Sequence, residues 1–189
     1  MRNNSVLVLV DFQPRMFRGV HSGDTKLIMN AVAAIVKSAN IMKIPIIVTT
    51  IGEKVNGEIV HELKDVLEPR TTIIERKIPG FDAFDDEAVR YAVEQTKCKN
   101  VVIAGLWTSM CFAFSALHAV KLGYNVYGLM DAGGDDTLLA HDCGVKRMIH
   151  SNIVPMTWMP VVSSWMHDWT DKNAEKMSRD VYSVYSFNP

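Results

Sequence analysis

Residues 101–131 read VVIAGLWTSMCFAFSALHAVKLGYNVYGLMD, and they decide the fold. The segment at 100–106 is an apolar run after Asn100, and it predicts a strand buried on both faces. Apolar residues at helical spacing follow over 108–123, and Gly123 is a natural C-terminal cap for that helix. A second strand is expected at 124–131. Strand, helix and strand in this order predict a right-handed βαβ unit with parallel strands.

The same alternation extends in both directions along the chain. Further strands are expected at 5–11, 44–51, 71–77 and 153–158, and further helices at 25–43, 58–67, 85–98 and 136–152. No linker or repeat interrupts the pattern over the 189 residues, which predicts a single domain, 1–189. The predicted fold is a three-layer Rossmann-like α/β sandwich, whose six-stranded, mostly parallel sheet has the order 3-2-1-4-5-6.

The segment after the last predicted strand has a different composition. It carries several aromatic residues that a closed core would not need, namely Trp165, Trp169, Tyr182, Tyr185 and Phe187. We interpret the chain from about residue 160 as an oligomerisation tail, and we expect a homo-oligomer.

Composition limits the classes of partner. The net charge is −1 without a block of one sign, which argues against a nucleic-acid or membrane partner and favours a small-molecule substrate. The three cysteines are too widely spaced for a disulfide framework or a metal pair: Cys98, Cys111 and Cys143. We therefore expect a reducing compartment, the cytoplasm. We also expect no metal and no other cofactor. The apolar run near the N-terminus stops at Asp11 and is too short for a signal peptide.

Reactive side chains follow three of the predicted strands. Asp11 ends the first strand, Lys77 ends the third, and Cys111 begins the helix after the fourth. Ligands bind at the carboxyl ends of parallel strands, so these three residues are expected at one edge of the sheet. A helix start and a lysine lower the pKa of a thiol, and an aspartate can carry its proton. This set suits acyl transfer.

Each residue also has an ordinary structural interpretation. Cys111 at the start of an apolar helix is more often a core residue, and Asp11 is often a turn or cap residue. Lys77 is often a solvated surface charge. Their shared position at the ligand-facing edge is what favours the functional interpretation. Cys98 and Cys143 have no comparable partners in the sequence.

At these residues the sequence resembles the isochorismatase-like cysteine hydrolases. The resemblance lies in VLVLVDFQ, ERKIPGFDAF and the segment G-x-x-T-x-x-C with its following helix and strand. GLWTSMC and the later IVPMTWMPVVSSWMHDW are most similar to the YcaC-like branch, whose substrates are unassigned. The resemblance covers most of the chain. It implies the triad Asp11, Lys77 and Cys111, and a non-proline cis peptide bond between Leu106 and Trp107.

The implied cis bond turns the backbone N–H of Trp107 toward that of Cys111, and together they would form an oxyanion hole. The sequence departs from the metal-dependent members, which carry several histidines after the second strand, because His61 is the only histidine there. Members of the family that cleave a vinyl ether lack the cysteine in some cases, so the presence of Cys111 favours acyl or amide chemistry over vinyl-ether cleavage.

The predicted function is therefore hydrolysis of a C–N or related acyl bond of a small molecule. Aromatic residues near the strand ends are candidates for the substrate pocket, although any one of them is more often core: Phe12, Phe17, Phe81, Phe84 and Trp107. The alternative from another class is a non-catalytic oligomeric binding or scaffold protein of the same fold. A thiol redox sensor is a third possibility, but no resolving cysteine lies near Cys111 in the sequence.

Overall fold

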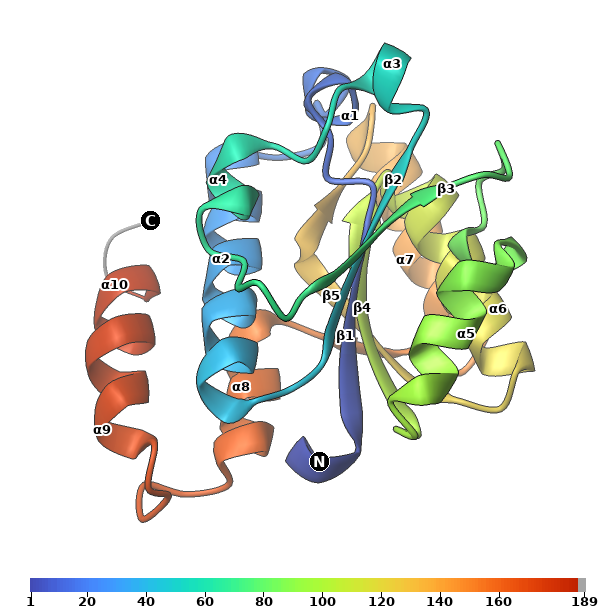
Figure 1. Ribbon diagram of the computed structural model, residues 1–189. Helices are drawn as coiled ribbons and strands as arrows, with labels where there is room; N and C mark the ends of the chain where they lie inside the picture. Colours follow the sequence, from blue (N-terminus) through green and yellow to red (C-terminus); the bar gives the residue numbers. More distant parts are fainter. Residues whose placement is uncertain (187–189) are drawn as a thin grey trace.

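The computed structural model describes residues 1–186. Its centre is one sheet of six strands in the order β3-β2-β1-β4-β5-β6, and every neighbouring pair is parallel (Figure 1). The strands are β1 (Ser5–Val10), β2 (Ile46–Ile51), β3 (Thr72–Arg76), β4 (Asn100–Leu106), β5 (Asn125–Gly134) and β6 (Val154–Met156). The predicted fold class and strand order are confirmed, and the sheet is entirely parallel.

Each face of the sheet is covered by its own group of helices, as Figure 1 shows. One face carries α2 (Thr25–Met42), α4 (His61–Lys64), α8 (Trp158–Met166) and the C-terminal helices. The other carries α5 (Glu87–Gln95), α6 (Ala113–Lys121) and α7 (Leu138–His150). This double coverage explains why the central strands are continuous apolar runs.

Alternation along β1 shows how one strand serves both cores. Leu7 and Leu9 belong to the core under α2 and α8, whereas Val6, Val8 and Val10 belong to the core under α5 and α6. Side chains of a strand point alternately to opposite faces, so a strand between two helical layers must be apolar at every position. All six residues of β1 are buried.

Short elements connect the layers at the carboxyl edge of the sheet. They are α1 (Pro14–Arg18), α3 (Glu53–Asn56), η2 (Ala83–Asp85) and η3 (Thr108–Phe112). The predicted helix from residue 108 therefore begins as a distorted turn, in which Met110 has non-helical backbone angles (φ −110°, ψ −110°). Regular helix starts at Ala113, and Gly123 lies just beyond its end with φ +86°.

Four strands are shorter than the sequence predicted, and two of them, β3 and β6, form the edges of the sheet. β3 ends at Arg76, one residue before Lys77, and β6 spans only Val154–Met156. An edge strand has a neighbour on one side only, so fewer ladder hydrogen bonds define its ends.

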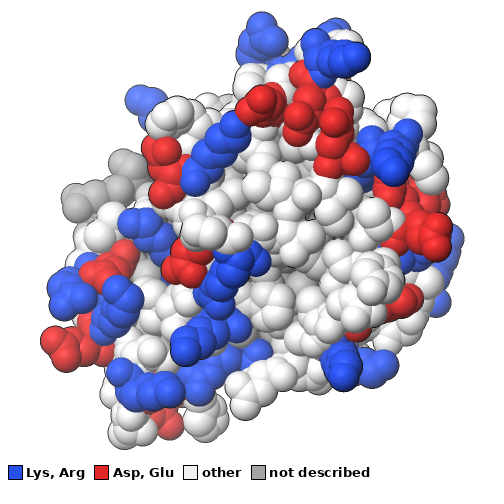
Figure 2. All heavy atoms as spheres, viewed as in Figure 1, with Lys and Arg blue, Asp and Glu red and all other residues white. Residues whose placement is uncertain are grey.

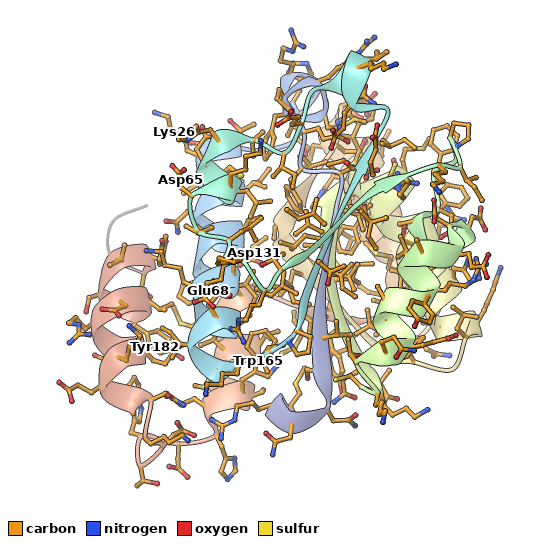
Figure 3. All side chains as sticks on the ribbon, in the orientation of Figure 1. Lys26, Asp65, Glu68, Asp131, Trp165 and Tyr182 are labelled. Carbon is orange, nitrogen blue, oxygen red and sulfur yellow. The ribbon has the colours of Figure 1, made fainter. Side chains whose placement is uncertain are left out.

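The C-terminal tail packs on its own chain. After α8 come α9 (Ala174–Met177), η4 (Ser178–Tyr182) and α10 (Ser183–Tyr185), which lie against α2 (Figure 1). Trp165 is 2% exposed, and the ring of Tyr182 contacts Trp158 and Trp169. Trp165 and Tyr182 are labelled in Figure 3.

These contacts change the interpretation of the tail. Most of its buried apolar residues complete the core over α2, so the core is not closed before the tail begins. Trp169 alone among the tail's tryptophans stays open, at 64% exposure. Phe187 lies outside the described residues. The argument from surplus aromatic residues for an oligomerisation tail therefore loses most of its basis, and subunit contact through this segment stays a prediction.

The surface carries both signs of charge. Figure 2 shows lysine, arginine and acidic side chains interspersed around the rim of one face, with a largely uncharged centre. Among residues 1–186, no helix has the length and apolar character needed to cross a bilayer.

Candidate active site

Asp11 and Arg76 form a buried ion pair at the carboxyl edge of the sheet. Asp11 follows β1 with a left-handed backbone (φ 60°), and Arg76 is the last residue of β3. The Nη2 of Arg76 donates to Oδ2 of Asp11, and neither side chain has any exposed surface. Thr49 on the intervening strand donates its hydroxyl to Oδ1 of Asp11 at 3.0 Å. Strand order thus places three adjacent strand ends around one carboxylate.

Arg76 has a further contact and an unused donor. Its Nη1 donates to the carbonyl oxygen of Gly80 at 2.8 Å. Its Nε is buried and has no acceptor among the described residues. Buried donors are normally satisfied, so this unpaired Nε–H needs an explanation.

Lys77 is not brought to this site. Its side chain is exposed and borders a hollow of about 390 Å³ with Glu75, Glu87 and Tyr91. Its backbone N–H donates to Oδ2 of Asp86 at 2.7 Å. Neighbouring residues of an extended chain point to opposite sides, so the side chain that turns inward beside Asp11 belongs to Arg76. The structure therefore places Arg76, and not Lys77, beside Asp11, and the catalytic role of Lys77 stays a prediction.

Cys111 lies in η3 and is 7% exposed. Burial, and then the negative charge of Asp11, raise the pKa of its thiol to about 12, while the positive charge of Arg76 acts in the opposite direction. Both charges therefore reach the sulfur. The expectation of a depressed thiol pKa is wrong, because burial outweighs the positive charge of Arg76. The resting thiol is protonated at neutral pH.

Burial also affects Asp11. It raises the pKa of this carboxyl above its ordinary value, even though Arg76 and the hydroxyl of Thr49 favour the charged form. A carboxylate with a raised pKa holds a proton more readily than an exposed one. Asp11 and Cys111 thus share one buried site, in which burial favours the neutral form of both groups.

The turn between β4 and α6 contains the cis peptide bond expected between Leu106 and Trp107. The backbone N–H of Trp107 has no acceptor among the described residues, whereas its carbonyl oxygen accepts from the N–H groups of Met110 and Phe112. The indole Nε1 of Trp107 donates to the carbonyl oxygen of Met16 in α1 at 2.8 Å. A free backbone donor is therefore available four residues before the thiol.

Side chains that sequence reasoning missed hold this turn in place. The Oδ2 of Asp135, which follows β5, accepts from the N–H of Ser109 at 2.7 Å. Nδ1 of His141 in α7 lies 2.9 Å from the hydroxyl of Thr108. A Cβ on Gly144 would lie 2.8 Å from Cα of Ser109, so this glycine allows α7 to approach the turn. The sequence alone gives no signal that these residues converge.

The five aromatic candidates for a substrate pocket separate into two groups. Phe12 and Phe84 are fully buried core residues, as the ordinary interpretation has it. Phe17 borders a hollow of about 370 Å³ with Met29 and Lys26, which is labelled in Figure 3. Phe81 is 58% exposed beside Phe114, and Trp107 is half-buried. Only the second group is open to a ligand.

One group of side chains outside this site has a composition that suits a metal ion. The Nδ1 of His118 lies 2.9 Å from Oδ2 of Asp82 and 3.6 Å from Oδ1 of Asp85. Hydrogen bonds and ion pairs within the group already account for these distances. His61, the histidine after β2, is exposed and paired with Asp65.

Comparison with known proteins agrees with the fold. The family profile described as "Isochorismatase domain" matches residues 5–159. "Probable hydrolase YcaC" of Escherichia coli is 33% identical over 170 residues, which cover 89% of this chain and 80% of that protein.

Two solved structures are similar over almost the whole chain. The YcaC gene product of Escherichia coli, described as an octameric hydrolase of unknown specificity, has a TM-score of 0.90 and 30% identity over 97% of this chain and 89% of that one. YcaC from Pseudomonas aeruginosa, solved with hexane-2,5-diol and covalent acrylamide, has a TM-score of 0.89 and 28% identity over 98% and 92%.

The fold and the matched relatives define the class of protein as an isochorismatase-like hydrolase. The chain belongs to the isochorismatase family, and it is similar to the YcaC hydrolases within it.

Proposed function

We propose that the protein is a cysteine hydrolase that cleaves a C–N bond, or a related acyl bond, of a small molecule. The observation that carries this proposal is the thiol of Cys111, held on the turn after β4 where the charge of Asp11 acts on it. A thiol whose pKa is about 12 needs a base at neutral pH. Asp11 is the carboxylate beside it, and its raised pKa suits it to take the proton.

The proposed reaction has two halves. In the first, Asp11 takes the thiol proton while the sulfur of Cys111 bonds to the substrate carbonyl carbon, and the carbonyl oxygen becomes an oxyanion. The C–N bond then breaks, the amine leaves with the proton from Asp11, and a thioester remains. In the second half, Asp11 takes a proton from water, the hydroxide attacks the thioester, and the C–S bond breaks. The sulfur recovers its proton from Asp11.

The oxyanion needs donors placed before the reaction begins. We assign this role to the backbone N–H groups of Trp107 and Cys111. The N–H of Trp107 has no acceptor among the described residues, which supports the assignment. Phe17, Phe81 and Trp107 are the candidates that remain for contact with the substrate.

Assembly and location are part of the proposal. The Escherichia coli relative is octameric, and we infer a homo-oligomer several times 21.2 kDa for this chain, which light scattering measures. The three cysteines are unpaired, which supports a reducing compartment such as the cytoplasm. The proposed chemistry uses no cofactor.

The test is a hydrolysis screen over amides, ureas, carbamates and esters. Cys111→Ala should lower turnover about a thousandfold or more and leave substrate binding intact. Cys143→Ala is the matched control, because Cys143 is exposed on α7, and it should have no effect. Acrylamide should add to Cys111 and block turnover. A ligand that binds tightly and that neither wild type nor Cys111→Ala converts would favour the non-catalytic binding protein instead.

A further inference from the structure

We propose that His141 is a positioning residue of the active site, and that it holds the backbone N–H of Trp107 in place through the hydroxyl of Thr108. The inference rests on the proposed hydrolase function and adds to it a residue of α7. The carrying observation is one contact. Nδ1 of His141 lies 2.9 Å from Oγ1 of Thr108, the residue directly after Trp107, and Thr108 is fully buried.

The contact completes a set of anchors around Trp107. Its indole Nε1 donates to the carbonyl oxygen of Met16 at 2.8 Å, and its carbonyl oxygen accepts from two N–H groups of the same turn. His141 holds the residue that follows. A backbone N–H lies in the plane of its peptide group and cannot rotate alone, so its direction is set by the residues on either side. The anchors therefore fix where the N–H of Trp107 points.

The surroundings of the hydroxyl make His141 its main partner. A Cβ on Gly133 would lie 2.9 Å from Oγ1 of Thr108, so the hydroxyl lies close against the bare backbone of β5. His141 and Gly144 are three residues apart on one face of α7, and Gly144 is where this helix meets the backbone of Ser109. Thr108 has no exposed surface, so bulk water does not replace the ring nitrogen. A hydroxyl left unpaired there costs free energy, which a shift of the turn would relieve.

A shift of the turn should affect one kind of reaction more than another. Stabilisation of an oxyanion depends on the exact position of its donors, and a displacement of about 1 Å can cost about a hundredfold in rate. The reactivity of the sulfur itself depends on its protonation and its accessibility. Losing the Thr108–His141 contact should therefore slow reactions of Cys111 that form an oxyanion more than reactions that form none.

The experiment compares two probes of the same sulfur in the full-length protein. With p-nitrophenyl acetate, the sulfur of Cys111 bonds to the carbonyl carbon and the carbonyl oxygen becomes an oxyanion. The C–O bond then breaks, p-nitrophenolate leaves, and an acetyl thioester remains; the thiol proton passes to Asp11. With iodoacetamide, the sulfur bonds to the methylene carbon and iodide leaves, without an oxyanion.

Both rates are read on the Cys111 peptide by mass spectrometry of acid-quenched samples. The measured quantity is the ratio of the acylation rate to the alkylation rate. Because both reactions use the same thiolate, the ratio cancels a change in its protonation. Thermal unfolding of each variant is measured alongside, since a purely structural role would lower the unfolding temperature and leave the ratio unchanged.

His141→Leu should lower the ratio about tenfold or more. Thr108→Val removes the other end of the contact with little change of shape, and it should lower the ratio to a similar extent. The double variant should be no worse than the more affected single variant, because both changes break one contact.

Two further variants separate the contact from the mere presence of a histidine. His141→Asn should recover most of the ratio, because its amide can donate or accept and its terminal atoms are as many bonds from Cα as Nδ1 is. His150→Leu is the matched control, because it makes the same chemical change at an exposed histidine of α7, and it should stay within about twofold of wild type. An unchanged ratio in His141→Leu and Thr108→Val, an equal loss in His150→Leu, or additive losses in the double variant would overturn the assignment.

Neither probe is the natural substrate, so the two proposals can fail separately. If the ratio falls as expected but the amide and ester screen yields no turnover, the positioning role of His141 stands and the hydrolase proposal falls. If turnover depends on Cys111 but the ratio in His141→Leu equals that of the wild type, the hydrolase proposal stands and the role of His141 is refuted. A wild-type Cys111 that iodoacetamide alkylates and the ester does not acylate would refute both.

Discussion

Replacing Asp11 by Asn should make Cys111 more acidic and yet remove turnover. The amide keeps the shape of the carboxylate but carries no charge. In the wild type, burial and then the charge of Asp11 raise the pKa of the thiol to about 12, against the influence of Arg76. Without the carboxylate, the guanidinium of Arg76 acts alone on the sulfur.

The size of the change follows from Coulomb's law. Two unit charges about 4 Å apart at an effective dielectric constant of about 20 interact by about 4 kcal/mol. Removing that repulsion gives about a thousandfold more thiolate at a fixed pH, since about 1.4 kcal/mol corresponds to a factor of ten. Turnover should still fall to near background, because an amide cannot accept the thiol proton.

The assay is a pH titration of the ultraviolet absorbance of the thiolate. Subtracting the same titration of Asp11→Asn with Cys111→Ala removes the signals of tyrosines and of the other two cysteines. A Cys111 thiol that titrates at the same pH as in the wild type, or higher, would show that the charge of Asp11 does not reach the sulfur. Retained turnover in a correctly folded Asp11→Asn protein would show that another group carries the proton.

Four further outcomes are expected. Above pH 9 the unfolded chain releases the Cys111 proton that the folded state keeps. The free energy of unfolding of the wild type, measured by urea unfolding, should therefore fall by up to about 4 kcal/mol between pH 9 and pH 12. Cys111→Ala should not show this fall. Gly144→Ala should destabilise the fold by about 1 to 3 kcal/mol in the same assay, because its Cβ meets Cα of Ser109; Lys146→Ala, exposed on the same helix, is the control. Asp135→Ala should lower kcat about tenfold with little change in KM, because the N–H of Ser109 loses a charged acceptor and the turn that carries the thiol loosens. Turnover should survive EDTA, because the proposed chemistry uses a thiol, a carboxylate and backbone N–H donors and no metal ion; loss on chelation and recovery with zinc would contradict it.

The layout of the sheet could be predicted because its signal is local. Buried parallel strands are continuous apolar runs, and the runs at β1, β2 and β4 are unambiguous. The ends of these runs placed Asp11 and Cys111 correctly at the carboxyl edge. Strand order then brings them together, since β1 lies between β2 and β4.

The position of Arg76, rather than Lys77, beside Asp11 could not be predicted because its signal in the sequence is ambiguous. In an extended TTIIERK segment, one face would carry Ile73, Glu75 and Lys77, and the other would carry Ile74 and Arg76. Each face holds one isoleucine and one cation, so alternation alone does not say which face turns inward. Only packing decides it: Ile74 contacts the core under α5, and Ile73 is 52% exposed at the sheet edge.

The acidity of the thiol was mispredicted for a related reason. A helix start and a nearby cation can be read from sequence, and both lower a thiol pKa. The depth of burial cannot be read in the same way, and here it is the largest influence. Depth depends on α7 closing over the turn, which requires Gly144 and the contacts of Asp135 and His141.

A buried thiol with a high pKa is compatible with catalysis because burial acts on its base as well. Desolvation raises the pKa of Asp11 and of Cys111 in the same direction, so it opposes ionisation of either group. Moving a proton from the sulfur to the carboxylate exchanges one buried anion for another, and much of the desolvation cost is common to both states. The free energy of the proton transfer then depends on the difference between the pKa values of Cys111 and Asp11. The positive charge of Arg76 acts on both groups, and it limits that difference. It follows that opening the site to water should weaken the coupling between the pair, even though it would lower the pKa of the thiol taken alone.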